Sequence, residues 1–261
     1  LDRNHLKGWG RVSIPADANP SDNDDWFVFD EPVTRRAVIV ADDAQVVRPL
    51  QLASAIPPDP LVKCESEVVT TENLGTVEWE NLSLLLWRAP LPNAEQGKLI
   101  KAFLDRGGQA IFFPPASPDQ AEFLGVRWTG WSDHPDGVQV ENWRSDQDLL
   151  SQTLSGGPLP VGQLTVRRSC GLSGEFTPLA TLRGGDPLLA RVSAGSGGGA
   201  GGAYFCATSP AGGDSSLASN GIVLYVLVQR AMARGAKVLG NTRELIAGDP
   251  MGEDPSQWKK I

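Results

Sequence analysis

Short apolar runs alternate with amphipathic stretches between residues 37 and 113, and this order constrains the fold more than any other feature. Residues 37–40, 82–87 and 110–113 are almost entirely apolar, which is typical of strands that are buried on both faces of a sheet. An amphipathic helix is expected at residues 46–55, and another begins after Asn93. This alternation predicts βαβ units and therefore a parallel sheet.

The helix that follows Asn93 has clear signals at both of its ends. The Asn93 side chain can cap the first turn, and Gly107 and Gly108 can end the helix. Four residues form its apolar stripe: Leu99, Ile100, Phe103 and Leu104. A further, shorter strand is expected at residues 68–69, so the region 33–113 supplies four strands.

The second half of the chain has a different pattern, rich in glycine and in short alternating runs. These runs predict hairpins that extend the sheet in an antiparallel manner, at residues 162–168, 176–182, 188–192 and 203–206. The glycine-rich segment 195–202 is expected to connect two of the strands. It is not expected to bind phosphate, because no Lys-Ser or Lys-Thr pair follows it. An apolar helix is expected at residues 222–232.

The sequence predicts three parts along the chain. Residues 1–32 form a β-hairpin that ends a preceding sandwich-like module, because two short strand-like runs flank a polar turn there. Residues 33–248 form the α/β domain, with a β-rich insertion at about 125–206. Residues 249–261 form a loose polar tail.

The charge balance excludes some classes of partner. The chain has 31 Asp and Glu residues against 23 Lys and Arg residues, which gives a net charge of −8. We expect no nucleic-acid partner, because phosphate binding needs clustered basic side chains. The sequence contains no run of 18 apolar residues, so this part of the protein is not expected to span a membrane. It also predicts no cofactor.

The scarce cysteines and histidines limit nucleophilic chemistry. Cys64 and Cys206 lie in strand-like apolar runs and are expected to be buried. Cys170 is the remaining thiol, and His134 is the histidine far from the start of the chain. A catalytic pair would therefore be Cys170 with His134, although a solvated loop histidine is the simpler interpretation of His134.

Polar residues follow several of the expected parallel strands, and ligands of open α/β sheets bind at that edge. Asp42, Asp43, Arg88 and Ser117 are the candidate ligand-binding residues. For Asp42, the preferred interpretation is that it caps the helix that follows it.

The acidic turn in the N-terminal hairpin is a weak metal candidate. Asp17, Asp22 and Asp24 could supply oxygen ligands to calcium, but their spacing does not match an EF-hand loop. A solvated turn is the preferred interpretation, and no metal site is predicted.

The stretch 82–113 resembles the class I glutamine-amidotransferase-like fold, which is flavodoxin-like. The order strand, helix, Gly107-Gly108 and strand carries this resemblance. In the enzymes of that family, the last strand leads into a sharp elbow that carries a cysteine nucleophile. Pro114, Pro115 and Ala116 stand at the matching place here, so the resemblance implies a fold without the catalytic residue.

Nearly the whole chain resembles the extracytoplasmic part of large bacterial membrane proteins with an aerotolerance-regulator (Bat-type) N-terminal region. The segments that carry this resemblance are 8–12 (GWGRV), 27–29 (FVF), 36–40 (RAVIV), 204–209 (YFCATS) and 221–230 (GIVLYVLVQR). The resemblance implies a periplasmic domain that belongs to a longer, membrane-anchored protein. It supplies no catalytic residues.

Three functions follow from these observations. The first is a non-catalytic, extracytoplasmic binding or assembly domain with protein partners in or at the membrane. The second is a domain that binds a small ligand or a sugar at the carboxyl edge of the sheet. The third is a hydrolase or amidotransferase that uses the displaced Cys170.

Overall fold

The computed structural model describes residues 8–15, 23–29, 34–41, 43–60, 62–153, 156–193 and 201–238. The chain divides into two compact units, and the larger unit spans Val33–Gly240. The described part of the smaller unit is a hairpin of β1 (Gly8–Ser13) and β2 (Asp24–Phe29), paired antiparallel with Gly8 opposite Phe29. A hairpin is what the sequence predicts there.

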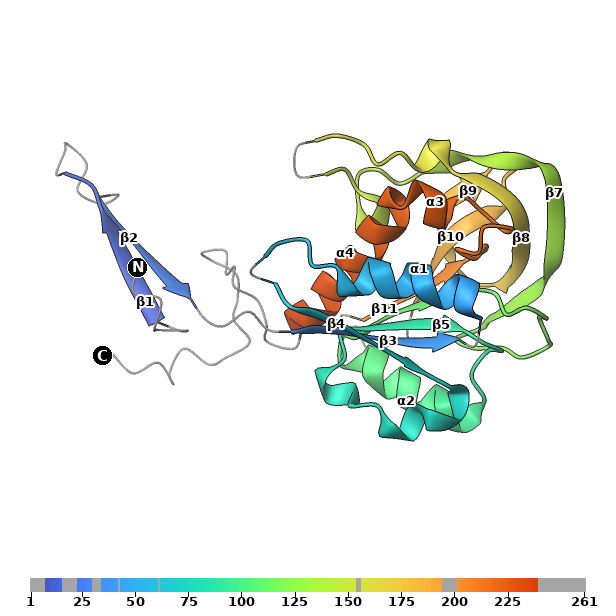
Figure 1. The fold of residues 1–261 in the computed structure, drawn as a ribbon, viewed down its shortest axis with the longest axis horizontal. Coiled ribbons are helices and arrows are strands. Elements are labelled where there is room, and N and C mark those ends of the chain that lie inside the picture. Colours follow the sequence, from blue (N-terminus) through green and yellow to red (C-terminus); the bar gives the residue numbers. More distant parts are fainter. Residues whose placement is uncertain are drawn as a thin grey trace. The chain divides into compact units, whose positions relative to one another are not determined.

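The larger unit is an α/β fold built on one nine-stranded mixed sheet with the order β4-β3-β5-β6-β11-β10-β9-β7-β8 (Figure 1). Its strands are β3 (Arg35–Ala41), β4 (Cys64–Val69), β5 (Leu84–Arg88), β6 (Gln109–Phe112), β7 (Val126–Trp143), β8 (Thr165–Gly174), β9 (Thr177–Leu182), β10 (Pro187–Val192) and β11 (Gly202–Cys206). Its helices are α1 (Ala44–Ala55), α2 (Ala94–Asp105), α3 (Leu217–Asn220) and α4 (Ile222–Val238), with short 3₁₀ helices η2 (Thr71–Thr76), η3 (Trp79–Asn81), η4 (Asp148–Leu150) and η5 (Val161–Gln163).

The parallel half of the sheet consists of β4, β3, β5, β6 and β11. The prediction of parallel strands in the first half of the chain is confirmed. The last of these strands corrects the sequence analysis, which placed residues 203–206 in the antiparallel extension. In the structure, β11 pairs parallel with β6 on one side and antiparallel with β10 on the other. It therefore joins the two halves of the sheet.

The antiparallel half contains an element that the sequence analysis did not resolve. Strand β7 is 18 residues long and pairs with both β8 and β9, with shifts of register along its length. The run expected at residues 162–168 is instead split between η5 and the start of β8.

Helices cover both faces of the parallel half and divide the core in two (Figure 1). On one face, α1 and α4 pack over Ile39, Leu86 and Ile111. On the other face, α2 packs over Leu85, Trp87 and Phe112. This arrangement explains why residues 37–41 of β3, 84–87 of β5 and 110–112 of β6 are apolar: both faces of these segments are buried, whereas the edge strand β4 is largely exposed.

Local sequence signals set the ends of α2. The Asn93 carboxamide oxygen accepts hydrogen bonds from the Glu95 and Gln96 amides at 3.0 Å, and the Gln96 side chain accepts one from the Asn93 amide. This capping box confirms the expected role of Asn93. At the other end, Gly107 adopts a positive φ of 94°, which glycine tolerates best. The predicted stripe is confirmed except for Leu99, which is 42% exposed.

None of the described helices is both long and apolar enough to cross a membrane.

Candidate functional site

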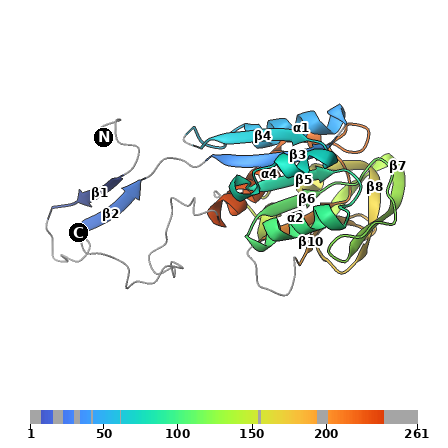
Figure 2. The same cartoon turned by 90° about the horizontal axis from the view of Figure 1, so that it is seen from below.

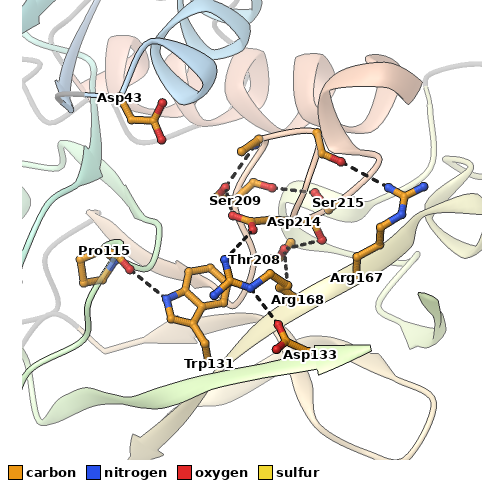
Figure 3. A network of polar contacts seen from close by, with 12 residues as sticks. Asp43, Pro115, Trp131, Asp133, Arg167, Arg168, Thr208, Ser209, Asp214 and Ser215 are labelled. Carbon is orange, nitrogen blue, oxygen red and sulfur yellow. Dashed lines mark hydrogen bonds and ion pairs between the residues drawn. The ribbon is translucent and has the colours of Figure 1, made fainter. Parts of the chain in front are cut away.

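The carboxyl ends of the parallel strands gather polar side chains at one edge of the sheet. Asp43 follows β3, Arg88 ends β5, Pro114 and Pro115 follow β6, and the turn 207–216 follows β11. Because the strands are parallel, these segments meet at the edge where α/β proteins bind ligands. Several of these residues are drawn together in Figure 3.

The structure brings together two of the four predicted ligand-binding residues. Arg88 Nη2 lies 3.6 Å from Asp43 Oδ2, and the Arg88 side chain is only 8% exposed. The other Asp43 oxygen accepts a hydrogen bond from the Gln45 amide at 2.9 Å and so caps α1. Asp42 lies outside the described residues, and Ser117 is an exposed residue beyond the end of β6. Asp43 and Arg88 thus form an ion pair that anchors the start of α1.

The end of β6, where the sequence resemblance would put a nucleophile elbow, is closed by packing. Phe113, Pro114 and Pro115 are all buried, and the Phe113 amide donates to the Trp87 carbonyl at 2.7 Å. The Trp131 indole N–H donates to the Pro115 carbonyl at 3.1 Å (Figure 3). The antiparallel half of the sheet therefore covers the carboxyl end of β6.

A charged network, which the sequence analysis missed, occupies the rest of the edge. Asp214 accepts a 2.6 Å hydrogen bond from the Ser209 hydroxyl and pairs with Arg168 Nη1 at 3.3 Å (Figure 3). Arg168 Nε also donates to Asp133 at 2.9 Å, and the guanidinium lies 4.6 Å from the centre of the Trp131 ring. A cation over an indole face is attracted to it, so Arg168 links β7, β8 and the turn after β11.

Hydrogen bonds to the main chain complete this network. The Thr208 hydroxyl donates to the Arg168 carbonyl at 2.7 Å, and the Ser215 hydroxyl donates to the Ser209 carbonyl at 2.6 Å. Asp214 and Ser215 are buried, and their side chains bind neighbouring protein groups. The polar groups of this edge are therefore directed at one another.

The three cysteines are poor nucleophiles in this structure. Burial raises the pKa of Cys206 to about 11. Burial also raises the pKa of Cys170 and of the half-buried Cys64 above the ordinary thiol value. At neutral pH these groups are therefore thiols, whereas the attacking species is the thiolate.

The structure does not bring Cys170 and His134 together as the enzyme hypothesis requires. His134 Nε2 lies 2.8 Å from the Ser169 hydroxyl, and Ser169 precedes Cys170 in β8. Neighbouring residues of a strand point to opposite faces, so Cys170 enters the core while Ser169 meets the imidazole. Ser169 and His134 have the spacing of a nucleophile and a base, but the described residues offer no third group that orients the ring.

The metal candidates fall largely outside what the structure describes. Asp17 and Asp22 are not among the described residues, and for Asp24 only the backbone is described. Within the described ranges, no group of three or more His, Cys, Asp or Glu side chains could hold a metal ion.

A second polar cluster ties the insertion to the core. Asp148, whose side chain is 7% exposed, accepts a hydrogen bond from the Tyr204 hydroxyl at 2.9 Å and pairs with Arg191 at 3.1 Å and with Arg234. Burial raises the pKa of Asp148, but the Tyr204 hydrogen bond and the two guanidinium charges outweigh it, so the net pKa is lowered. Burial, and then the Asp148 charge, raise the pKa of Tyr204 to about 12. The cluster connects η4, β10, β11 and α4.

A cavity of about 430 Å³ lies at the opposite end of the strands from the predicted ligand edge. Residues at the start of β3, in β4 and in the segment 76–82 line it. The sequence pattern does not predict a binding site at this place.

No family model matches the chain, and no curated protein matches it significantly. Solved structures with a similar backbone include a β-galactosidase from Rahnella sp. R3, with 14% identity and a TM-score of 0.49 over 77% of this chain and 31% of that one. An exo-β-1,4-mannosidase from Opitutaceae bacterium strain TAV5 has 10% identity and a TM-score of 0.42, over 81% and 35% of the two chains. A cytoplasmic protein from Salmonella typhimurium has 9% identity and a TM-score of 0.46, over 85% and 94%. The chain thus spans about a third of the two glycosidases, and similarities this distant assign it no activity.

Proposed function

We propose that this chain is a non-catalytic binding or assembly domain of a membrane-anchored protein and acts outside the cytoplasm. One observation carries the proposal. Pro114 and Pro115 are buried after β6, where the related enzymes place their nucleophile, and the Trp131 indole binds the Pro115 carbonyl. Recovering a reactive side chain at this place would require the antiparallel half of the sheet to move.

The proposal includes a flavodoxin-like, class I glutamine-amidotransferase-like fold. In support, the five parallel strands lie in the spatial order second, first, third, fourth, fifth along the chain. This is the order of flavodoxin-like sheets. The extracytoplasmic location and the membrane anchor rest on the resemblance of segments such as 8–12 and 221–230 to Bat-type membrane proteins.

The polar side chains at the carboxyl edge of the sheet favour a binding or assembly domain over the other two functions, a small-ligand site and a hydrolase. A small-ligand or sugar site needs polar groups that converge on an open pocket. Here Asp43 pairs with Arg88, and Asp214 pairs with Arg168 and Ser209. A hydrolase that uses Cys170 would need an activated thiol, whereas burial raises the pKa of Cys170.

The experiment exposes the folded chain to a fluorophosphonate and to a chloroacetamide, which label activated serines and thiols, and measures intact mass. We expect no adduct while the chain stays folded. A rapid stoichiometric adduct at Cys170 or Ser169 that disappears in His134→Ala would overturn the non-catalytic assignment. In parallel, cross-linking of the full-length protein in intact cells should join residues of the larger unit to a membrane-associated protein. Cross-links that leave this unit free of partners would contradict the binding role.

A further inference from the structure

The edge strand β4 is where the sheet could accept another strand. Within the described part of the chain, β4 pairs only with β3, and Figure 2 shows it at the border of the sheet. A strand at the edge of a sheet carries a row of backbone N–H and C=O groups that an extended segment can pair with. Strand β4 has six residues, Cys64–Val69, which is a usual length for such pairing.

The cavity of about 430 Å³ opens beside this strand on the face that α2 covers. Register places Glu65 opposite Arg36 and Glu67 opposite Val38, so these four side chains share one face of the sheet. The segment with η2 and η3 closes the cavity from the other side with Val77 and Glu78. Val38 and Val77 are buried, so the cavity has apolar residues in its wall and carboxylates at its rim.

The rim has a net negative charge. Arg36 pairs with Glu65 at 3.2 Å and with Glu78 at 2.8 Å, so one cation serves two carboxylates. Glu67 is exposed, and its carboxylate has no ion pair or hydrogen bond with a described residue. A cationic side chain placed beside Glu67 would complement the rim.

We propose that β4 and this cavity form a docking groove for an extended segment of a protein partner that carries basic residues at alternate positions. The segment adds to the sheet as a strand beside β4. Its basic side chains lie on the side of Glu65 and Glu67, because directly opposite residues of neighbouring strands share a face. Its intervening residues lie beside Ser66 and Val68, and Val68 is 37% exposed, so apolar residues fit there. The proposal rests on the binding role proposed above and gives that role a surface and a partner chemistry.

Charged residues on an edge strand can also serve only to prevent unwanted pairing. That role requires charge on the strand but neither a cavity nor carboxylates from a separate segment. Here Glu78 comes from outside the sheet and shares Arg36 with Glu65. The carboxylates and Arg36 therefore surround a cavity, which the prevention of unwanted pairing does not require. Peptide binding distinguishes a docking role from a purely protective one.

The probe is a fluorescent hexapeptide of alternating lysine and valine, titrated into the 261-residue chain and followed by anisotropy. Two control peptides have alternating glutamate and valine, or the lysines and valines in two blocks. We expect the alternating basic peptide to bind about tenfold more tightly than either control, and to slow hydrogen exchange at the amides of 64–69. Equal binding of the alternating and block peptides, or exchange protection elsewhere, would overturn strand addition at β4.

A matched pair of variants tests the role of the carboxylate. Glu67→Gln should weaken binding about 1.4- to fivefold, the range of an exposed ion pair of about 0.2–1 kcal/mol. Glu122→Gln changes the net charge equally, and Glu122 is exposed and remote in sequence from the groove, so this variant should bind as the parent does. If both variants weakened binding equally, the attraction would depend only on the net charge of the chain, and the proposed docking groove would be overturned. These outcomes leave the labelling and cross-linking results untouched, so the groove can fail while the binding role stands.

Discussion

Tyr204 shows how a single buried group can report on the packing of the insertion. Its side chain is fully buried in β11, and its hydroxyl joins Asp148 and Arg234. An unfolded tyrosine ionises near pH 10, whereas the pKa of Tyr204 in the folded chain is about 12. Because the folded pKa is raised, this contribution to stability is complete below about pH 10 and is lost as the pH rises to about 12.

The first prediction uses the fact that the chain has only two tyrosines. An absorbance titration of tyrosinate should show one residue that ionises only near pH 12, and Tyr204→Phe should remove this step. At pH 7, Tyr204→Phe should lower the free energy of unfolding by about 1–3 kcal/mol, because a hydrogen bond to a carboxylate is lost. Urea denaturation measures this change. A step near pH 12 that survives in Tyr204→Phe would contradict the assignment.

The second prediction concerns the thiols. At pH 8, Ellman's reagent should react slowly with Cys64, which is half-buried, and should not react with Cys170 or Cys206 in the folded chain. All three should react in guanidinium chloride. Alkylation followed by peptide mapping identifies the modified site. Preferential modification of Cys170 under native conditions would contradict the buried, protonated state described for this thiol.

At the scale of the elements, Asp43 both caps α1 and neutralises Arg88. The third prediction separates the two roles with two variants. Asp43→Asn keeps a capping oxygen and loses the charge, so it should cost about 1 kcal/mol, because the Arg88 side chain is almost fully buried beside it. Asp43→Ala also loses the cap and should cost about 1 kcal/mol more. Equal urea midpoints for the two variants would show that the cap contributes nothing.

Helix α4 approaches the sheet more closely than a side chain would permit. A Cβ atom on Gly235 would lie 1.9 Å from the Ser83 carbonyl oxygen, which is backbone and cannot rotate away. The fourth prediction is that Gly235→Ala lowers the free energy of unfolding by about 3 kcal/mol, because the helix must shift. The control is Gly75→Ala, where no atom lies within 4 Å, and it should change stability by less than about 1 kcal/mol. Thermal melts of both variants test the comparison, and equal melting temperatures would contradict it.

The elements that the sequence predicted well are those set by neighbouring residues. The capping box at Asn93 and the apolar runs of β3 and β5 are local signals, and each forms where it was expected. Strand β7 was not predicted because its 18 residues change pairing partner and register. No continuous alternation of apolar and polar residues therefore extends along the whole strand. The pairing of β11 with β6 joins residues far apart in the chain, which periodicity cannot detect.

The same distinction applies to the site. Asp43 and Arg88 could be placed at one edge from the sequence because each follows an apolar run. The network of Arg168 and Asp214 could not, because it depends on the position of β8 beside the turn after β11. The cavity was missed for a similar reason, since its far wall is a segment of short 3₁₀ helices without a periodic pattern.

On the scale of the whole larger unit, one continuous sheet joins the parallel and antiparallel halves through β11. The fifth prediction is that both halves unfold together. Trp87 lies in the parallel half and Trp128 in the antiparallel half, and both are buried. Urea curves from tryptophan fluorescence and from far-ultraviolet circular dichroism should therefore coincide, as in a two-state transition. Two separate urea midpoints would contradict this prediction. If Trp87→Phe removed one fluorescence transition and Trp128→Phe removed the other, the two halves would unfold independently.

The carboxylates along β4 also determine how the molecule behaves among its own copies. If two molecules met border to border through this strand, Glu65 and Glu67 of one would face the same residues of the other. Like charges directly opposite each other are destabilising, so we expect this pairing of two copies to be disfavoured. On this argument, the edge of β4 disfavours a second copy of this chain and favours a strand of opposite charge.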